Sequence, residues 1–384
     1  MKILLVSTSS GSRGGGELCL LYLGRALRER GHRVTLWVSS HPCMDELAVR
    51  FAELGEVVRA DYTNTYDRRG RSIASYCDSA TASRAAAQWR ELAPDVIHLN
   101  KQNLEDGLDL VEAARRCALP ALAMIHITQN ATYLRAQFAA VRDFIARRAL
   151  RRFPGVLVTT PESRRRDLAA FLGDAARVRV VANGVPIPDP ASREASREAV
   201  RGELGLSPDH LLCLAVGRMV PQKRPLLFLE IAEQIHAQIP TARFHWVGDG
   251  PLAARWDEWV VAHQLGEVIQ RLPWRNDVPR LLTAGDVFLH VAEFEGLAFA
   301  ILEAIAACLP CAITSNLLAE MAFLNESNSI AIKPDATWIA QLRDRDRLRR
   351  IGKAAGQLAA EQFSFARMAA EYEVLYHESI VASQ

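Results

Sequence analysis

The chain has 384 residues, of which 49% are hydrophobic, 23% are charged and 7% are aromatic. These proportions exclude a disordered or fibrous protein and suggest two globular domains. A net charge of +2 gives no general attraction to nucleic acid, so no such partner is expected. Seven scattered cysteines are typical of reduced thiols. The sequence contains no apolar run of about 18 residues and no signal peptide, so a cytoplasmic protein is expected.

The first half of the sequence alternates short apolar runs with helical segments. Residues 2–8 predict a buried strand and residues 9–17 a glycine-rich loop. A helix over 18–31 and a strand over 32–40 complete one right-handed βαβ unit. Continuous apolar runs, typical of a parallel sheet covered on both faces, predict further strands. These strands are expected at 95–100, 121–128, 155–160 and 178–185.

The composition changes at residues 186–210, where proline and charge predict a linker that leads into a helix. A second series of strands is expected at 211–218, 242–251, 268–274, 286–293 and 311–316. An amphipathic helix over 363–380 is expected to return to the first domain. The predicted fold is α/β, with two Rossmann-like doubly wound domains facing across a cleft at the strand ends. Their predicted bounds are 1–186 plus 363–384, and 187–362.

The loop after the first strand is rich in glycine, at Gly11, Gly14, Gly15 and Gly16. Glycines allow a tight turn and expose backbone amides at a helix start, which favours anions. The spacing is not that of a dinucleotide fingerprint, which disfavours a nicotinamide oxidoreductase. Glu17 stands where a Walker loop has lysine. A phosphate- or sugar-facing loop and a plain strand-to-helix turn both remain open.

Two cations follow the first strand of the second series. Arg218 stands at the end of that strand, and Lys223 follows it in the same loop. Arginine binds a diphosphate through paired hydrogen bonds, and lysine acts as a point charge. Such charge-assisted bonds are worth about 1.5–3 kcal/mol each. A solvated basic loop is the alternative.

Two glutamates, Glu295 and Glu303, flank a short apolar run. The pattern predicts a turn over 293–296 and a helix over 297–308, apolar nearly all round, with Glu303 about two turns along it. A partly buried carboxylate there needs partners, and the hydroxyl groups of a ribose or sugar would serve. The two acids would also suit a general acid and base. The alternative is an exposed cap and a surface residue.

In this order the segments resemble the retaining glycosyltransferases of the two-domain GT-B fold, family 4. The resemblance covers nearly the whole chain. Its motifs are the GGGE loop, His126 in AMIHIT, ANGV at 182–185, Arg218 with Lys223, VGDGP at 247–251, and Glu295 with Glu303. The sequence departs from the family at Ala298, where glycine is usual. It also departs before Glu320, where a glycine pair is usual.

The resemblance implies a metal-independent retaining hexosyltransferase. Its donor would be a nucleotide diphosphate sugar, UDP-linked before GDP-mannose. Its acceptor would be a saccharide or glycolipid hydroxyl in the biosynthesis of a cell-surface polysaccharide or glycoconjugate. The nucleotide sugar is a substrate, so no cofactor and no metal is implied. Arg218 and Lys223 would hold the diphosphate, Glu303 the ribose and Glu295 the donor sugar.

The implied site has members in both domains. His126 would approach the donor sugar from the first domain, as a catalytic residue with Glu295, Arg218 and Lys223. The remaining donor-binding residues would be Gly15, Gly16, Gly296, Leu297 and Ala298.

Two other functions remain open, a non-catalytic nucleotide-sugar-binding protein of the same fold and a sugar-nucleotide epimerase. The arginines of 142–153 fit either a solvated face or peripheral contact with anionic lipid at the inner membrane face. The polar and aromatic segment 61–76 is expected to take part in acceptor choice.

Three further features have simple structural alternatives. His98 is structural or on the acceptor side, and Trp274 either stacks on the base or lies in the core. The pair Cys308 and Cys311 lacks the second pair that a metal site needs, so packing is expected.

Overall fold

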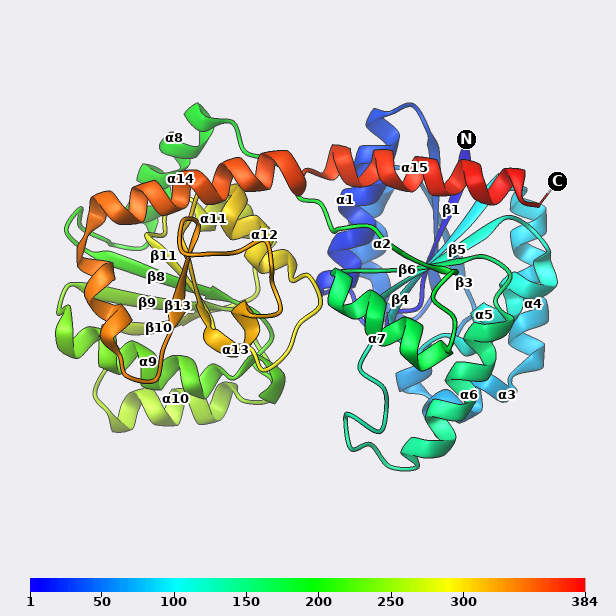
Figure 1. Ribbon diagram of the computed structural model, residues 1–384, viewed down its shortest axis with the longest axis horizontal. Coiled ribbons are helices and arrows are strands. Elements are labelled where there is room, and N and C mark those ends of the chain that lie inside the picture. The colour runs from blue at the N-terminus through cyan, green and yellow to red at the C-terminus, as the bar shows by residue number, and fades with distance from the viewer. Residues whose placement is uncertain (384) are drawn as a thin grey trace. The chain divides into compact units, whose positions relative to one another are not determined.

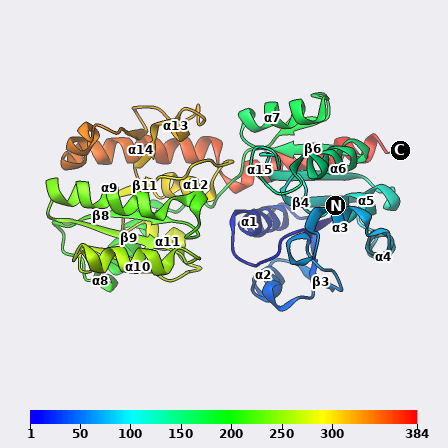
Figure 2. The same cartoon turned by 90° about the horizontal axis from the view of Figure 1, so that it is seen from below.

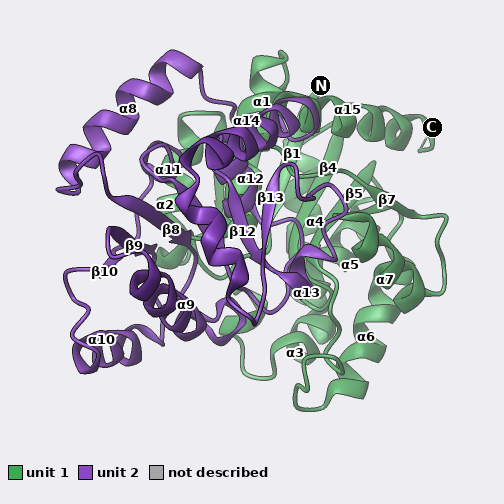
Figure 3. Ribbon diagram, turned by 60° about the vertical axis from the view of Figure 1, so that its left-hand side comes forward, with its two compact units in different colours: residues 1–184, 365–384 green, residues 185–364 purple. Residues whose placement is uncertain are grey.

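A computed structural model describes residues 1–383 (Figure 1). The chain divides into two compact units, shown in two colours in Figure 3. Unit 1 holds residues 1–184 and the chain end from Phe365, and unit 2 holds Val185–Ser364. The sequence-based prediction ended the first stretch of unit 1 at residue 186 and began its second stretch at residue 363. Each unit has its own parallel sheet with flanking helices, which confirms the α/β fold class (Figure 2).

Unit 1 has a seven-stranded sheet in the order β3-β2-β1-β4-β5-β6-β7, with every pair of neighbouring strands parallel. The strands are β1 Lys2–Ser7, β2 Arg33–Ser39, β3 Glu56–Ala60, β4 Val96–Asn103, β5 Ala121–Ile127, β6 Val156–Thr159 and β7 Val178–Val180. The sequence prediction lacks β3, because this edge strand is only partly buried and has no continuous apolar run. β7 is shorter than predicted.

The helices of unit 1 cover both faces of its sheet. α1, α2 and α15 lie on one face and the other helices on the opposite face. The strand order runs from β1 to β3 in one direction and from β4 to β7 in the other. Because the crossover connections are right-handed, the helices of the two series lie on opposite faces. The helices are α1 Gly15–Glu29, α2 Asp45–Ala52, α3 Arg71–Cys77, α4 Ser79–Leu92, α5 Leu108–Cys117, α6 Ala139–Arg152, α7 Glu162–Leu172 and α15 Phe365–Val381. Two short 3₁₀ turns are η1 Pro42–Met44 and η2 Thr65–Asp67.

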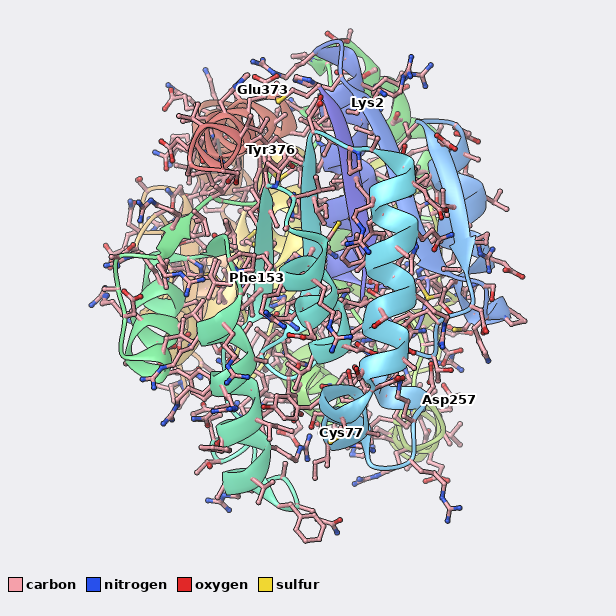
Figure 4. The ribbon with its side chains drawn as sticks, turned by 90° about the vertical axis from the view of Figure 1, so that its right-hand side faces the viewer. Lys2, Cys77, Phe153, Asp257, Glu373 and Tyr376 are labelled. Atoms are coloured by element: carbon pink, nitrogen blue, oxygen red, sulfur yellow. The ribbon has the colours of Figure 1, made fainter. Side chains whose placement is uncertain are left out.

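The last helix, α15, belongs to unit 1, as predicted. Its Glu373 forms an ion pair with Arg30 and contacts the ring of His32, just after the end of α1. Its Tyr376 hydroxyl lies 2.8 Å from Nδ1 of His98, which is fully buried on β4. Glu373 and Tyr376 are labelled on this helix in Figure 4. Burial lowers the pKa of His98 to about 3, so this histidine is a neutral structural contact.

Unit 2 has a six-stranded parallel sheet in the order β10-β9-β8-β11-β12-β13. The strands are β8 Leu211–Val216, β9 Ala242–Val247, β10 Ile269–Leu272, β11 Val287–His290, β12 Cys311–Thr314 and β13 Ser329–Ile332. The helices are α8 Pro190–Glu203, α9 Pro225–Gln238, α10 Ala253–Ala262, α11 Val278–Leu282, α12 Phe299–Ala306, α13 Ser315–Leu318 and α14 Arg345–Gln362, with 3₁₀ turns η3 Pro221–Lys223 and η4 Thr337–Arg343. The edge strand β13 is absent from the prediction.

The strand order of each sheet reverses direction at one point. In unit 1 this point lies between β1 and β4, and in unit 2 it lies between β8 and β11. Open α/β sheets bind ligands outside the carboxyl ends of the strands at such a point. The loops after β1, β4, β8 and β11 are therefore the places to look for function. Within residues 1–383, no helix has the length and apolar character needed to cross a bilayer.

Candidate functional site

The loops after β8 and β9 in unit 2 are joined through their backbones. Met219 N donates a hydrogen bond to Asp249 O at 2.9 Å. Gly248 has a φ of 133°, and a Cβ atom on it would lie 2.3 Å from Gly217 O. Glycine is therefore required at position 248, both for its conformation and for this close approach. The backbone that carries Arg218 is fixed by these contacts.

The loop after β11 is held against η3, the turn that carries Lys223. Glu293 N donates to Gln222 O at 2.8 Å, and Gln222 Nε2 donates to Phe294 O at 2.9 Å. The Lys223 ammonium forms an ion pair with the carboxylate of Glu295. Two predicted site residues from distant parts of the sequence are thus in direct contact within unit 2.

Glu295 is buried, at 8% exposure, and charged. Burial alone raises the pKa of this carboxyl, but the Lys223 ammonium and a contact from His290 bring it down to about 2. His290 Nε2 lies 3.3 Å from Glu295 Oε1, and burial lowers the pKa of the imidazole. The exposed cap that was an alternative for Glu295 is therefore excluded.

His290 is absent from the sequence-based predictions. Its one signal is its position as the last residue of β11, at the carboxyl edge of the sheet. Glu303, by contrast, is 5% exposed near the middle of α12, in agreement with the predicted burial.

The start of α12 lies just beyond Glu295. Ala298 is its N-cap residue, and an alanine side chain has no oxygen with which to cap the first turn. A helix N-terminus carries a partial positive charge and favours anions. Arg218, on the neighbouring loop, is exposed and forms no ion pair with any residue the structure describes. Together with Lys223, these groups make this edge of unit 2 suited to a diphosphate.

His126 in unit 1 belongs to a second polar cluster. Its Nε2 lies 2.8 Å from Oδ1 of Asn100 on the adjacent strand β4, and Asn100 Nδ2 donates to Gly16 O at 3.1 Å. Because the Asn100 oxygen must accept, Nε2 carries the proton and Nδ1 is left as an acceptor. Burial lowers the pKa of His126 to about 4, so the ring is neutral at pH 7. Asn100 is a further residue that the sequence-based predictions lack.

The two glycines predicted for the site differ in their surroundings. Gly15 is exposed at the first position of α1. Gly16 is buried, and a Cβ atom on it would lie 2.1 Å from Nε2 of Gln102. That amide donates to Ser9 Oγ at 2.6 Å and lies 3.2 Å from Glu17 Oε1. The polar end of β4 therefore lies close to Gly16, and a side chain at this position would have to displace the Gln102 amide.

The segment 61–76, which has no clear periodicity, is held by side-chain bonds to the loop after β4 and to the first turn of α5. Arg68 Nη2 lies 2.6 Å from Oδ2 of Asp109, and Ser72 Oγ donates to Glu105 at 2.8 Å. Within this segment η2 covers Thr65–Asp67 and α3 begins at Arg71, and both elements are too short to show a clear period in the sequence. Its part in acceptor choice stays a prediction.

The remaining candidates are structural or stay open. Cys308 packs against α14, because a Cβ atom on Gly356 would lie 2.3 Å from its Sγ. Trp274 is partly exposed and outside the core, so stacking on a base is not excluded by burial. Among residues 1–383, no cluster of three or more His, Cys, Asp or Glu side chains is arranged to hold a metal ion.

Comparison with known proteins places family matches on both units. The family described as Glycosyltransferase Family 4 matches residues 13–187, and Glycosyl transferases group 1 matches residues 210–344. The chain is 34% identical over 176 residues to the Escherichia coli UDP-Gal:alpha-D-GlcNAc-diphosphoundecaprenol alpha-1,3-galactosyltransferase, covering 45% of this chain and 43% of that protein. It is 23% identical over 185 residues to the Bacillus anthracis N-acetyl-alpha-D-glucosaminyl L-malate synthase, covering 47% and 48%. The chain thus spans about half the length of these curated relatives.

Solved structures match over the entire chain. Anabaena HepE in complex with UDP-glucose has a TM-score of 0.76 at 18% identity, covering 100% of both chains. Sucrose-phosphate synthase from Thermosynechococcus elongatus has a TM-score of 0.75 at 16% identity, again covering 100% of both. At these identities the likeness shows the fold alone.

Proposed function

The chain belongs to the GT-B glycosyltransferases of family 4 type, and from this premise we propose that it transfers a sugar from a UDP-sugar to a lipid-linked saccharide. The observation that carries the proposal is the Lys223–Glu295 ion pair beside the exposed Arg218, at the carboxyl edge of the unit 2 sheet. The name of the E. coli relative specifies a UDP-linked donor and a diphosphoundecaprenol-linked acceptor, which supports this choice of substrates.

We propose that Arg218 and Lys223 bind the diphosphate of the donor, with the start of α12 adding its partial positive charge. The leaving diphosphate gains negative charge as the glycosidic bond breaks. Fixed cations stabilise that charge most in the transition state, where it is largest. Because two side chains of the protein supply this stabilisation, we propose that the transfer needs no divalent metal.

The acidic groups are proposed to bind hydroxyl groups of the donor. Glu295 stays ionised through its contact with Lys223, so its carboxylate can accept hydrogen bonds from the transferred sugar. Glu303 is proposed to accept from the ribose hydroxyls. Gly296 and Leu297 complete this donor site as the backbone between Glu295 and α12.

His126 is proposed to accept a hydrogen bond from the transferred sugar through Nδ1. Asn100 supports this role because it holds the proton on the opposite ring nitrogen. The low pKa of about 4 keeps the imidazole neutral under physiological conditions. Gly15 and Gly16 are proposed to border the reaction centre, where a side chain would occupy the space of the sugar or of Gln102.

The proposal is tested with the purified full chain, a panel of UDP-sugars and polyprenyl-diphosphate-linked N-acetylglucosamine. We expect one UDP-sugar to be consumed, and only when the acceptor is present. We expect the same rate of consumption whether or not EDTA is added. NMR of the product is expected to show the anomeric configuration of the donor. Inversion would exclude the retaining mechanism, and loss of transfer in EDTA would exclude metal independence.

Two outcomes would replace the proposal with another function. A new UDP-sugar formed without acceptor would identify an epimerase. Tight UDP-sugar binding without turnover on any acceptor would identify a non-catalytic binding protein.

A further inference from the structure

The loop between β5 and α6, with the outer side of α6, exposes an unusual concentration of apolar side chains. Five of the twelve large hydrophobic residues exposed on the described chain lie within residues 133–144. They are Tyr133 at 63%, Leu134 at 46%, Phe138 at 73%, Val141 at 51% and Phe144 at 63% exposure. We call this group the β5–α6 tip. Single exposed apolar residues are common, but a cluster of this kind marks an interaction surface.

The β5–α6 tip is a formed element that holds its apolar side chains outward. The carboxylate of Asp143 accepts hydrogen bonds from Ala131 N at 2.7 Å and from Thr132 Oγ1 at 2.6 Å. Ala136 N donates to Ala131 O at 2.9 Å, which closes the loop. Phe138 has a φ of 55°, a costly conformation for a bulky residue, yet its ring is in solvent. In Figure 1 the loop and the start of α6 project beyond the other elements of unit 1.

The helix behind the tip is strongly basic. Residues 131–153 contain six arginines and one acid, which gives a net charge of +5. The acid is Asp143, whose carboxylate is buried in the loop contacts above. Val141, Phe144 and Arg148 are spaced at three and four residues, so they share one side of α6. Arg148 and Arg152 are exposed and form no ion pair with the described residues.

We propose that the β5–α6 tip and the arginines of α6 dock the protein on an anionic lipid bilayer. The rings of Phe138 and Phe144 enter the boundary between head groups and acyl chains, and Arg148 and Arg152 bind lipid phosphates. Interfacial elements bind through buried apolar area and through attraction between basic side chains and anionic lipids. Both contributions are present on this surface.

A second copy of the chain is a less suitable occupant of the same surface. A symmetric dimer would bring two arginine-rich segments together, and like charges at close range oppose association; Arg142 is paired with Glu105, but Arg148 and Arg152 would face their own copies. An anionic bilayer has the complementary charge and also accepts the aromatic rings.

Docking on a bilayer would bring the enzyme to a lipid-linked acceptor, so its role in catalysis rests on the proposed function. The tip leaves β5 directly after the strand segment that holds His126. A bilayer held at the tip would therefore present the sugar of a lipid-linked acceptor near the strand end of His126. Acceptors of this class would then be used at the membrane surface, while the donor arrives from solution.

The test measures co-sedimentation of the full chain with vesicles of phosphatidylglycerol and phosphatidylethanolamine, and with vesicles of phosphatidylcholine. We expect binding to the anionic vesicles and much weaker binding to phosphatidylcholine. Phe138→Ser with Phe144→Ser is expected to lower the partition coefficient at least tenfold, because each ring loses its apolar burial. Arg148→Gln with Arg152→Gln is expected to lower it about tenfold or more on anionic vesicles alone.

Two control variants carry comparable changes on other surfaces. Val49→Ser with Val374→Ser removes exposed apolar groups from α2 and α15, and Arg33→Gln with Arg255→Gln removes the same charge from other surfaces. Both controls are expected to bind as the wild type does. Absence of wild-type binding, or equal losses in the controls, would overturn the proposal. Loss of a dimer in light scattering with unchanged vesicle binding would instead identify a self-association surface.

These experiments test the membrane docking and the transferase function separately. Variants of the tip are expected to keep their thermal shift with UDP-sugars, because none of the proposed donor-binding residues lies within residues 133–144. Conversely, Lys223→Ala is expected to keep full vesicle binding. If no UDP-sugar binds while the vesicle results hold, the proposed function is wrong and the lipid surface stands.

Discussion

The Lys223 ammonium pairs with the Glu295 carboxylate across two loops at the carboxyl edge of the unit 2 sheet. The carboxyl is buried, which raises its pKa, and the nearby ammonium is the main reason why the pKa is nevertheless about 2. The folded-state pKa lies below the ordinary value of 4.5. The stability that this charge contributes is therefore present above pH 4.5 and is lost as the pH falls towards 2.

Replacement of Lys223 by alanine is expected to affect both donor binding and stability. Removal of one charge-assisted contact, worth about 1.5–3 kcal/mol, corresponds to an increase of roughly 10- to 150-fold in the Kd for UDP. The same change leaves the buried Glu295 without its cation and lowers the free energy of unfolding. Calorimetric titration with UDP and urea unfolding measure the two effects.

The double variant Lys223→Ala with Glu295→Gln separates these effects. It is expected to recover stability, because no buried charge remains unpaired, but not to recover UDP affinity. Lys353→Ala, at an exposed position of α14, is the control. Unchanged UDP affinity in Lys223→Ala would remove the central support for the diphosphate site.

Ala298 offers a test in which stability and binding change in opposite directions. Aspartate at this N-cap position is expected to stabilise the protein by about 0.5–2 kcal/mol, because its side chain can cap the first turn of α12. Its negative charge is expected to weaken UDP binding at least tenfold. Ala298→Asn supplies the same cap without the charge, so it should gain stability and lose little affinity. Equal Kd values for the two variants would show that no phosphate approaches this helix start.

The contact between Gly16 and Gln102 predicts a specific rescue. Gly16→Ala places a methyl group where the Gln102 amide now lies, at a cost of about 1–3 kcal/mol in the free energy of unfolding. In a Gln102→Ala background the methyl group has space, so the added cost is expected to be much smaller. A thermodynamic cycle of the four proteins, measured by urea unfolding, gives the coupling. An additive result would contradict the close approach.

His126 predicts a pH-dependent difference between two proteins. Its pKa is lowered from 6.5 to about 4, so unfolding takes up a proton between these values, and this histidine destabilises the fold as the pH falls. His126→Asn lacks this effect. The free energy of unfolding of the wild type is therefore expected to fall relative to that of the variant, by about 1.4 kcal/mol per pH unit below pH 6.5. His377→Asn, at an exposed position of α15, is expected to follow the wild type; a constant difference for His126→Asn would contradict the buried neutral ring.

The fold class could be predicted because the central strands of both sheets are continuous apolar runs between helical segments. The edge strands β3 and β13 escaped prediction for different reasons: β3 is only partly buried and has no continuous apolar run, whereas β13 is buried but only four residues long. The strand predicted over 178–185 is too long, because apolar residues continue in the sequence after β7, which ends at Val180.

The candidate site was predictable where a motif has a fixed spacing, as for Glu295 and Glu303. His290 and Asn100 were not, because each is a single polar residue in an apolar strand and acts on another residue of the site. Their partners become visible only when the strands are placed in register. The apolar side of the β5–α6 tip also escaped notice, since exposure of Phe138 and Phe144 cannot be read from an amphipathic pattern.

The return of α15 to unit 1 makes unit 2 an insertion within a single domain. The two connections are neighbours, with Val185 N donating to Phe363 O at 2.8 Å. During synthesis, His98 lacks its partner on α15 until Tyr376 leaves the ribosome, whereas all of unit 2 has by then been made. The inserted half can therefore mature first, and the half that begins the chain is the last to be completed.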